Sequence, residues 1–116
     1  MLILIADDQK HARQSLRALV VATFPEAEIL EATTGREALR LAEEVRPRLA
    51  ILDVRMPDLD GLAAAREIRS RWPEVRILVL TVDPSCSREA LAAGADAFVT
   101  KGEPPERLMS VLDALL

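Results

Sequence analysis

Short aliphatic runs alternate along the chain with longer stretches in which apolar residues recur every three or four positions. The aliphatic runs, which are typical of strands, cover residues 2–6, 28–32, 49–52, 76–80 and 97–100. Helical spacing is found at residues 12–20, 38–45, 64–72 and 108–115, and more weakly at about 87–93. Strand and helix therefore alternate five times.

This alternation predicts an α/β fold, doubly wound as (βα)5, in which a parallel sheet carries helices on both faces. The continuous apolar runs 2–5, 49–52 and 77–80 are expected in the buried centre of the sheet. Glu28 and Glu31 place the second strand at an edge. Thr34 and Glu37 have the spacing of a capping box, which predicts a helix start.

Length and composition narrow the class of protein. The chain has 116 residues, 50% of them hydrophobic, which is the size of one domain covering residues 1–116. Cys86 is the only cysteine, so we expect no internal disulfide and a reducing, cytoplasmic compartment. No apolar run approaches the ~20 residues of a membrane span, so no membrane partner is expected. The net charge of −4 argues against direct binding of nucleic acid.

Polar side chains lie at the carboxyl ends of the expected central strands, where ligands of open parallel sheets bind. Asp7 and Asp8 follow the first strand and Asp53 follows the third; Thr81 ends the fourth strand, and Lys101 follows the fifth. An aspartate in such a place is most often a helix N-cap, but five polar residues at one edge indicate a site.

The acids and the lysine of this set indicate the chemistry of the site. At an effective dielectric near 20, two carboxylates at ~4 Å repel by about 4 kcal/mol, so the cluster needs a cation. Hard oxygen ligands of this kind suit Mg²⁺, which favours one or two carboxylates together with a phosphate. Lys101, one of two lysines, and the Thr81 hydroxyl would then bind a phosphoryl group.

The motifs that carry these residues resemble, in order and over nearly the full length, the receiver domain of two-component response regulators. They are Asp7-Asp8 after the first strand, the run 53–57 followed by Gly61, Thr81, and the stretch 94–101. The residues of the first and last motifs are most similar to those of receivers that precede a helix-turn-helix DNA-binding domain. The resemblance implies a flavodoxin-like sheet in strand order 2-1-3-4-5.

The same resemblance implies a role for each site residue. Asp53 would accept the phosphoryl group from a phosphohistidine of a sensor histidine kinase. Mg²⁺ would be held by the carboxylates of Asp7, Asp8 and Asp53 and by the main-chain carbonyl of Arg55. Lys101 and Thr81 would bind the phosphate, and Thr81 and Phe98 would form the switch.

Partners and output follow from the resemblance as well. The chain would be a signalling phosphoacceptor that catalyses only its own phosphorylation and dephosphorylation, with transcription as the regulated output. Phosphorylation would promote a homodimer through the face made by the fourth helix, the fifth strand and the fifth helix. Because the sequence ends on the apolar pair Leu115-Leu116, we expect a linker and an output domain beyond it, through which DNA would be contacted.

Three features depart from the usual receiver pattern. Gly102 stands where proline usually follows the lysine, which leaves the isomer of the Lys101–Gly102 peptide open. Val82 replaces a small residue and would narrow access to the phosphate. The segment from Thr81 to Lys101 is about two residues short, which leaves the fourth helix in question.

Other classes of protein fit less well. A haloacid-dehalogenase-like phosphatase needs a second aspartate where Arg55 stands, and dinucleotide or P-loop folds need glycines in the first βα turn. His11 has no second imidazole near it in sequence and is interpreted as a surface residue. The remaining alternative is a receiver-like interaction module without phosphate turnover.

Overall fold

The chain forms a five-stranded parallel sheet flanked by helices, as seen in a computed structural model that describes all residues 1–116. The strands are β1 (Leu2–Ala6), β2 (Glu28–Ala32), β3 (Leu49–Asp53), β4 (Arg76–Thr81) and β5 (Ala97–Thr100). The helices are α1 (Lys10–Thr23), α2 (Gly35–Val45), α3 (Gly61–Arg71), α4 (Ser87–Ala92) and α5 (Pro105–Leu115), with a short 3₁₀ helix η1 (Pro84–Cys86) before α4. The strand order is β2-β1-β3-β4-β5, which confirms the predicted doubly wound fold.

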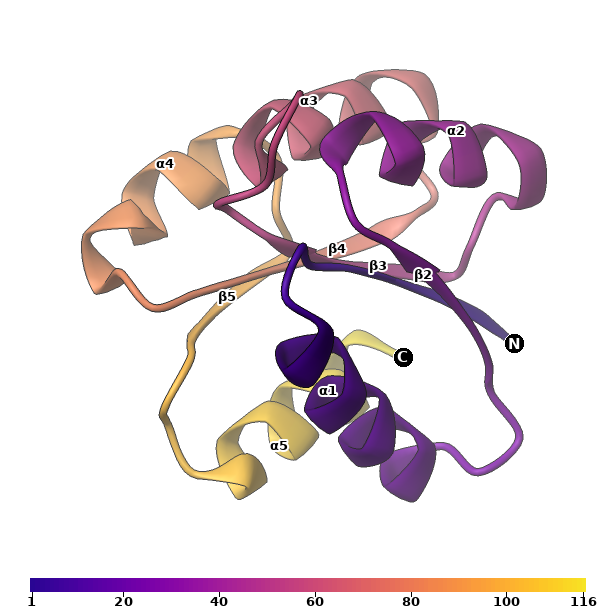
Figure 1. Ribbon diagram of the computed structural model, residues 1–116, viewed down its shortest axis with the longest axis vertical. Helices are drawn as coiled ribbons and strands as arrows, with labels where there is room; N and C mark the ends of the chain where they lie inside the picture. Colours follow the sequence, from indigo (N-terminus) through magenta and orange to yellow (C-terminus); the bar gives the residue numbers. More distant parts are fainter.

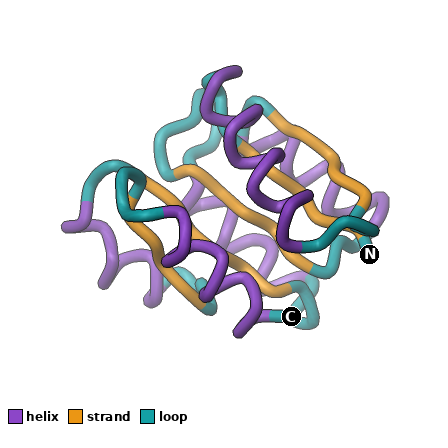
Figure 2. The backbone as a smooth tube through the Cα atoms, turned by 90° about the horizontal axis from the view of Figure 1, so that it is seen from below, coloured by secondary structure: helices purple, strands orange, loops and turns teal.

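Helices cover both faces of this sheet. Figure 1 shows α1 and α5 on one side and α2, α3 and α4 on the other, and in Figure 2 the strands lie between the two helical layers. On the face covered by α1 and α5, the sheet buries large aliphatic side chains, such as Ile5, Ile51 and Leu78. The opposite layer relies more on alanines, such as Ala42 and Ala65. None of the helices is both long and apolar enough to span a membrane.

The burial of the strands follows their sequence. β1, β3 and β4 are buried along almost their whole length. β2 pairs only with β1 and exposes Glu28 and Glu31, so the predicted edge strand is confirmed. β5 is the other edge, and Val99 is its only fully buried residue.

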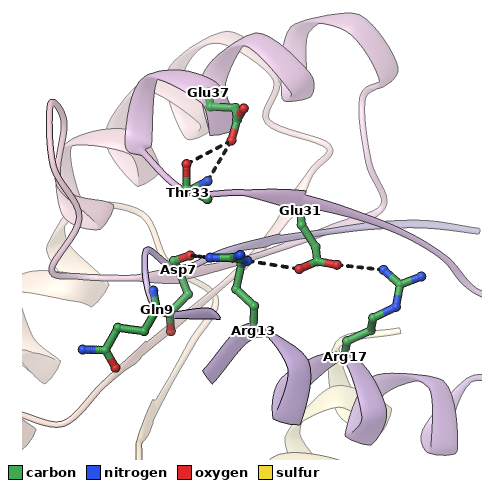
Figure 3. Close-up of polar contacts among 7 residues, drawn as sticks. All are labelled: Asp7, Gln9, Arg13, Arg17, Glu31, Thr33 and Glu37. Atoms are coloured by element: carbon green, nitrogen blue, oxygen red, sulfur yellow. Dashed lines mark hydrogen bonds and ion pairs between the residues drawn. The ribbon is translucent and has the colours of Figure 1, made fainter. Parts of the chain in front are cut away.

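The predicted capping motif starts α2, with one change in its partners. The Thr34 hydroxyl accepts a hydrogen bond from the Glu37 N–H at 3.0 Å. In return the Glu37 carboxylate accepts the N–H of Thr33 at 2.8 Å, one residue earlier than in the standard capping box (Figure 3). The helix therefore begins where the sequence indicated.

The shortened segment after β4 still forms the fourth helix, but α4 has only six residues. Asp83 stabilises the turn before it by accepting the N–H of Ser85 at 2.9 Å and its hydroxyl at 2.7 Å. Ala90 is the only buried side chain of α4, whereas Leu91 is 57% exposed and Val82, just before the turn, is 60% exposed. This region is therefore held by few buried contacts.

The β5–α5 connection explains the glycine after the lysine. The chain has no cis peptide bond, so the Lys101–Gly102 bond is trans. Gly102 has a φ of +95°, which a proline ring, fixed near −65°, does not adopt. The departure from the usual proline therefore goes together with a different backbone path.

The amino end of the sheet is closed by one ion-pair network. Arg69 of α3 donates to the Asp96 carboxylate, to the Gly94 carbonyl at 3.0 Å and to the Pro73 carbonyl at 2.6 Å. The same carboxylate accepts the N–H of Ile77 at 2.8 Å. These bonds tie α3, the start of β4 and the α4–β5 turn together.

Candidate functional site

The carboxyl ends of the strands bring the predicted site residues together. Asp53 lies opposite Leu80 in the β3–β4 register, and Thr81 lies opposite Thr100, the residue before Lys101, in the β4–β5 register. The strands thus end nearly in step, so side chains at their ends share one edge of the sheet. A depression of about 250 Å³ at this edge is lined by Asp8, Gln9, Ala12, Asp53, Arg55, Thr81, Val82 and Lys101.

Three carboxylates converge here. One oxygen from each of Asp7, Asp8 and Asp53 lies within 4.8 Å of the others. Asp7 and Asp53 are buried, whereas Asp8 is exposed and makes no hydrogen bond or ion pair in the protein. Asp7 accepts the Gln9 N–H at 2.9 Å, so one of its oxygens already has a partner. The spare capacity to bind a cation therefore lies with Asp8 and Asp53.

Lys101 is the cationic side chain that contacts this cluster. Its Nζ lies 2.7 Å from Asp7 Oδ2 and 3.5 Å from Asp53 Oδ2. Burial disfavours the ammonium, but the hydrogen bond to Asp7 and the charges of Asp53 and Asp7 outweigh burial, so the pKa of Lys101 is raised. One ammonium nevertheless leaves the three carboxylates with a net negative charge.

The environment of Asp53 favours its neutral form. Burial raises the pKa of the Asp53 carboxyl, and the charge of Asp7 raises it further. The charge of Lys101, its hydrogen bond and the backbone N–H of Arg55 oppose this rise without cancelling it. A cation bound here would therefore reduce the repulsion between Asp53 and Asp7 and favour the ionised form of Asp53.

The donor set fits Mg²⁺. Carboxylate oxygens are hard ligands, and the exposed Asp8 leaves the site open to water and to a phosphate. No cysteine or histidine lines the depression, so a soft, zinc-type ligand set is absent. The residues present are those that magnesium favours.

The backbone of Asp53 is fixed by the start of α3. The Gly61 N–H donates to the Val54 carbonyl at 2.9 Å. A Cβ atom at residue 61 would lie only 2.0 Å from the carbonyl oxygen of Asp53, so only glycine allows this approach. The end of β3 that carries Asp53 is therefore held closely against the start of α3.

The other predicted site residues differ in how closely they reach this centre. Thr81 is buried at the end of β4 and Val82 lines the depression, as expected from its position. Phe98 is half-buried and packs against the core on the side of α2, α3 and α4. The roles of these residues, and of the Arg55 carbonyl, stay predictions.

Arg13 is a residue of the site that sequence reasoning missed. Its guanidinium donates to the main-chain carbonyl of Asp7 at 2.9 Å and to the Glu31 carboxylate at 3.1 Å (Figure 3). The chain contains so many arginines that residue type alone did not distinguish Arg13 from the others. The available signal was its place near the start of the helix that follows the paired acids, from which a long side chain can reach back to their turn.

Comparisons with known proteins give a consistent result. A family model described as the response regulator receiver domain matches residues 3–113. The chain is 41% identical over 112 residues to the transcriptional regulatory protein YhcZ of Bacillus subtilis, which covers 94% of this chain and 52% of YhcZ. It is 41% identical over 116 residues to the response regulator MprA of Mycolicibacterium vanbaalenii, covering 98% of this chain and 49% of MprA. The chain thus spans about half the length of these curated relatives.

Solved structures agree over the whole chain. A two-component response regulator of the LuxR family from Aurantimonas has a TM-score of 0.91 at 31% identity and covers 98% of this chain and 83% of that one. The chemotaxis protein CheY4 of Vibrio cholerae has a TM-score of 0.86 at 31% identity, with 99% and 98% covered. The likeness therefore includes both helical layers and the edge of the sheet that bears the acids.

Proposed function

The chain belongs to the response regulator receiver domain family, and from this premise we propose that residues 1–116 form one receiver domain that is phosphorylated on Asp53. The donor is a phosphohistidine of a sensor histidine kinase. The observation that carries the proposal is the cluster in which Lys101 contacts both Asp7 and Asp53 while Asp8 stays open to solvent.

The transfer is a substitution at phosphorus. A carboxylate oxygen of Asp53 attacks the phosphorus, the P–N bond to the imidazole breaks, and the imidazole nitrogen keeps the electron pair and takes a proton from water. The product is an acyl phosphate, which water later hydrolyses. The carboxylates of Asp7, Asp8 and Asp53 and the Arg55 carbonyl would hold Mg²⁺, which would supply positive charge to the phosphoryl group.

Lys101 and Thr81 act on the group being transferred. The Lys101 ammonium, already beside Asp53, stabilises the charge on the phosphoryl oxygens and stays protonated because its pKa is raised. The Thr81 hydroxyl, at the rim of the same depression, donates a hydrogen bond to the phosphate. Asp53 itself must be ionised to attack, and both cations favour its ionised form.

Intact-protein mass spectrometry tests this assignment. Wild type incubated with Mg²⁺ and acetyl phosphate should gain one phosphoryl group, and Asp53→Asn should gain none. Asp96→Asn, which changes an aspartate at the other end of the sheet, is the matched control and should gain phosphate like wild type. Equal uptake by wild type and Asp53→Asn would overturn the assignment of Asp53.

The alternative is a receiver-like interaction module, and the short α4 is the feature that favours it. A wild-type protein that takes up no phosphate from acetyl phosphate or a phosphorylated kinase, yet still binds partners, would support this alternative. The proposed phosphoacceptor requires uptake and subsequent loss of the group.

We further propose that phosphorylation acts through Thr81 and Phe98 on the face formed by α4, β5 and α5, and promotes a homodimer there. A bound ligand shifts a conformational equilibrium only by its difference in affinity for the two states. Thr81 and Lys101 lie at strand ends that lead into this face, and Leu91 on α4 is 57% exposed. Thr81→Ala should therefore accept phosphate without changing its association state, whereas wild type should gain mass in sedimentation.

The biological setting is proposed from the relatives. YhcZ is named as a transcriptional regulatory protein, and this chain spans about half the length of such relatives. A cytoplasmic regulator is the setting that fits, with DNA bound by a further domain and not by this one. The receiver domain would then turn over only its own phosphoryl group.

A further inference from the structure

The Arg13 guanidinium lies between the acidic turn and the edge strand β2. Figure 3 shows it reaching the Asp7 carbonyl on one side and Glu31 on the other. The distances are 2.9 Å to the Asp7 oxygen and 3.1 Å to Glu31 Oε1. Its side chain is only 16% exposed, so these bonds are partly shielded from water.

The main chain of Asp7 is held at both of its polar groups. Its N–H donates to the Ala32 carbonyl of β2 at 3.0 Å, and its C=O accepts from Arg13. That carbonyl belongs to the peptide unit that leads into Asp8. Since a peptide unit is planar, fixing its carbonyl also fixes the direction in which the chain enters Asp8.

The carboxylate of Asp8 is not oriented by any contact of its own. Asp8 is exposed, and its carboxylate has no hydrogen-bond or ion-pair partner in the protein. Its direction toward Asp53 therefore depends on the backbone of the turn. Two side-chain contacts hold this backbone: Arg13 donates to the Asp7 carbonyl, and the Asp7 carboxylate accepts the Gln9 N–H.

Arg13 is in turn held by Glu31. The second oxygen of Glu31 accepts from Arg17 at 3.0 Å, so one carboxylate is shared by two guanidinium groups, one helical turn apart on α1. Only a guanidinium supplies two rigid donors in the two directions needed here, and an ammonium does not. Arg17 contacts Glu31 but not Asp7, which makes it a natural control.

We propose, on the basis of the metal site proposed above, that Arg13 is a positioning residue of the magnesium site. By bonding the Asp7 carbonyl it holds the acidic turn so that Asp8 faces Asp53, and Glu31 keeps Arg13 in place. Arg13 touches neither the metal nor the phosphoryl group.

The charge of Arg13 and its proposed positioning role predict opposite effects on the affinity for Mg²⁺, so the proposal can be tested directly. Arg13 carries a positive charge near the acids, so by Coulomb's law alone its removal should strengthen binding of Mg²⁺. If Arg13 instead orients the turn, its removal should weaken binding by roughly tenfold, as the loss of supporting hydrogen bonds does at other metal sites. Arg17→Met removes an equal charge from the same Glu31 and leaves the turn untouched.

Isothermal titration calorimetry with MgCl₂ tests this on wild type, Arg13→Met, Arg13→Lys and Arg17→Met. We expect Arg13→Met to bind Mg²⁺ roughly tenfold more weakly than wild type. Arg17→Met should bind as wild type does or slightly better. Arg13→Lys keeps the positive charge but cannot bond both partners as the guanidinium does, so its affinity should fall between those of Arg13→Met and Arg17→Met. Unchanged or stronger binding by Arg13→Met would overturn the proposal.

A second measurement separates this proposal from the metal site on which it rests. Amide hydrogen exchange of Gln9, whose N–H donates to Asp7, is read without metal in the same variants. It should be faster in Arg13→Met than in Arg17→Met. If wild type binds no Mg²⁺, the proposed metal site is wrong, but the exchange rate of Gln9 still tests whether Arg13 holds the turn. Equal exchange rates in Arg13→Met and Arg17→Met would overturn the positioning role. Should Arg13→Met not fold by circular dichroism, Arg13→Lys and Glu31→Gln carry the same comparison.

Discussion

The two ends of the parallel sheet both gather aspartates and cations, but they use them differently. At the amino end, the Asp96 carboxylate receives Arg69, the Ile77 N–H and, at 3.7 Å, Arg76. At the carboxyl end, Asp7 and Asp53 share one ammonium, and the third carboxylate, Asp8, has no partner. Acids are therefore found at both ends, and only their unused binding capacity distinguishes the functional end from the structural one.

Removing an acid from each end should separate the two roles most strongly. Asp96→Ala should lower the free energy of unfolding by roughly 1.5 to 3 kcal/mol, because it leaves Arg69 and the Ile77 N–H without their partner. Asp8→Ala is the matched control and should lose no stability without metal, since Asp8 has no contact to lose. Urea denaturation measures both; equal losses would remove the distinction between the two ends.

Within the carboxyl end, the two neighbouring acids should also differ. Asp8→Ala should weaken Mg²⁺ binding by roughly tenfold or more, and Asp7→Ala should weaken it less, because Lys101 and Gln9 already occupy the oxygens of Asp7. Calorimetric titration checks the order. As a control, Asp96→Asn should bind Mg²⁺ like wild type. A larger loss of Mg²⁺ affinity in Asp7→Ala than in Asp8→Ala would contradict the prediction that Asp8 is the more important ligand.

The raised pKa of Asp53 predicts a pH-dependent difference in stability. A carboxyl whose pKa is higher in the folded state holds its proton more tightly when folded, so its ionisation destabilises the protein as the pH rises. Without metal, Asp53→Asn should therefore be more stable than wild type at neutral pH. The difference should shrink as the pH falls through the folded pKa toward the ordinary value of 3.8. Thermal unfolding of both proteins across this range measures it, with Asp8→Asn as the exposed control; a constant difference would argue against the burial effect.

The smallest effect is expected at the rim of the site. Val82 lines the depression and should slow the entry of small phosphodonors. Val82→Ala should speed phosphorylation by acetyl phosphate by about threefold, which is less than 1 kcal/mol off the barrier. Stopped-flow or quenched time courses measure the rate, and Leu91→Ala, an exposed apolar change away from the depression, is the control. A rate unchanged by Val82→Ala would show that entry is not limited there.

The parallel α/β fold could be predicted from the sequence because the spacing of apolar residues distinguishes strands from helices, and their regular alternation along the chain indicates a parallel sheet. All five expected strands formed, and β3 and β4 each extend one residue further, to Asp53 and Thr81. The meeting of Asp7, Asp53 and Lys101 also followed, since parallel strands bring their carboxyl ends to one edge.

The contacts of long side chains were not predictable in the same way. Arg13 and Arg69 each select carbonyls and carboxylates from other elements, and several exposed acids would have been equally good partners for them in sequence. Which acid is chosen depends on the packing of α1 and α3 against the strands. The return bond of Glu37 moved to Thr33 for a similar reason, because it depends on the local path of the backbone.

The long separation between Asp7 and Lys101 has a consequence for how the protein is made. They form a bond at 2.7 Å although they are 94 residues apart in the sequence. At synthesis rates of about 5–20 residues per second, the ribosome needs on the order of 5 to 20 seconds to travel from one to the other. The three carboxylates lie at the ends of β1 and β3, whose residues are all translated well before Lys101. A chain that paired β1 with β3 before Lys101 was made would have to balance this charge with ions from solution, whereas the finished protein partly balances it itself.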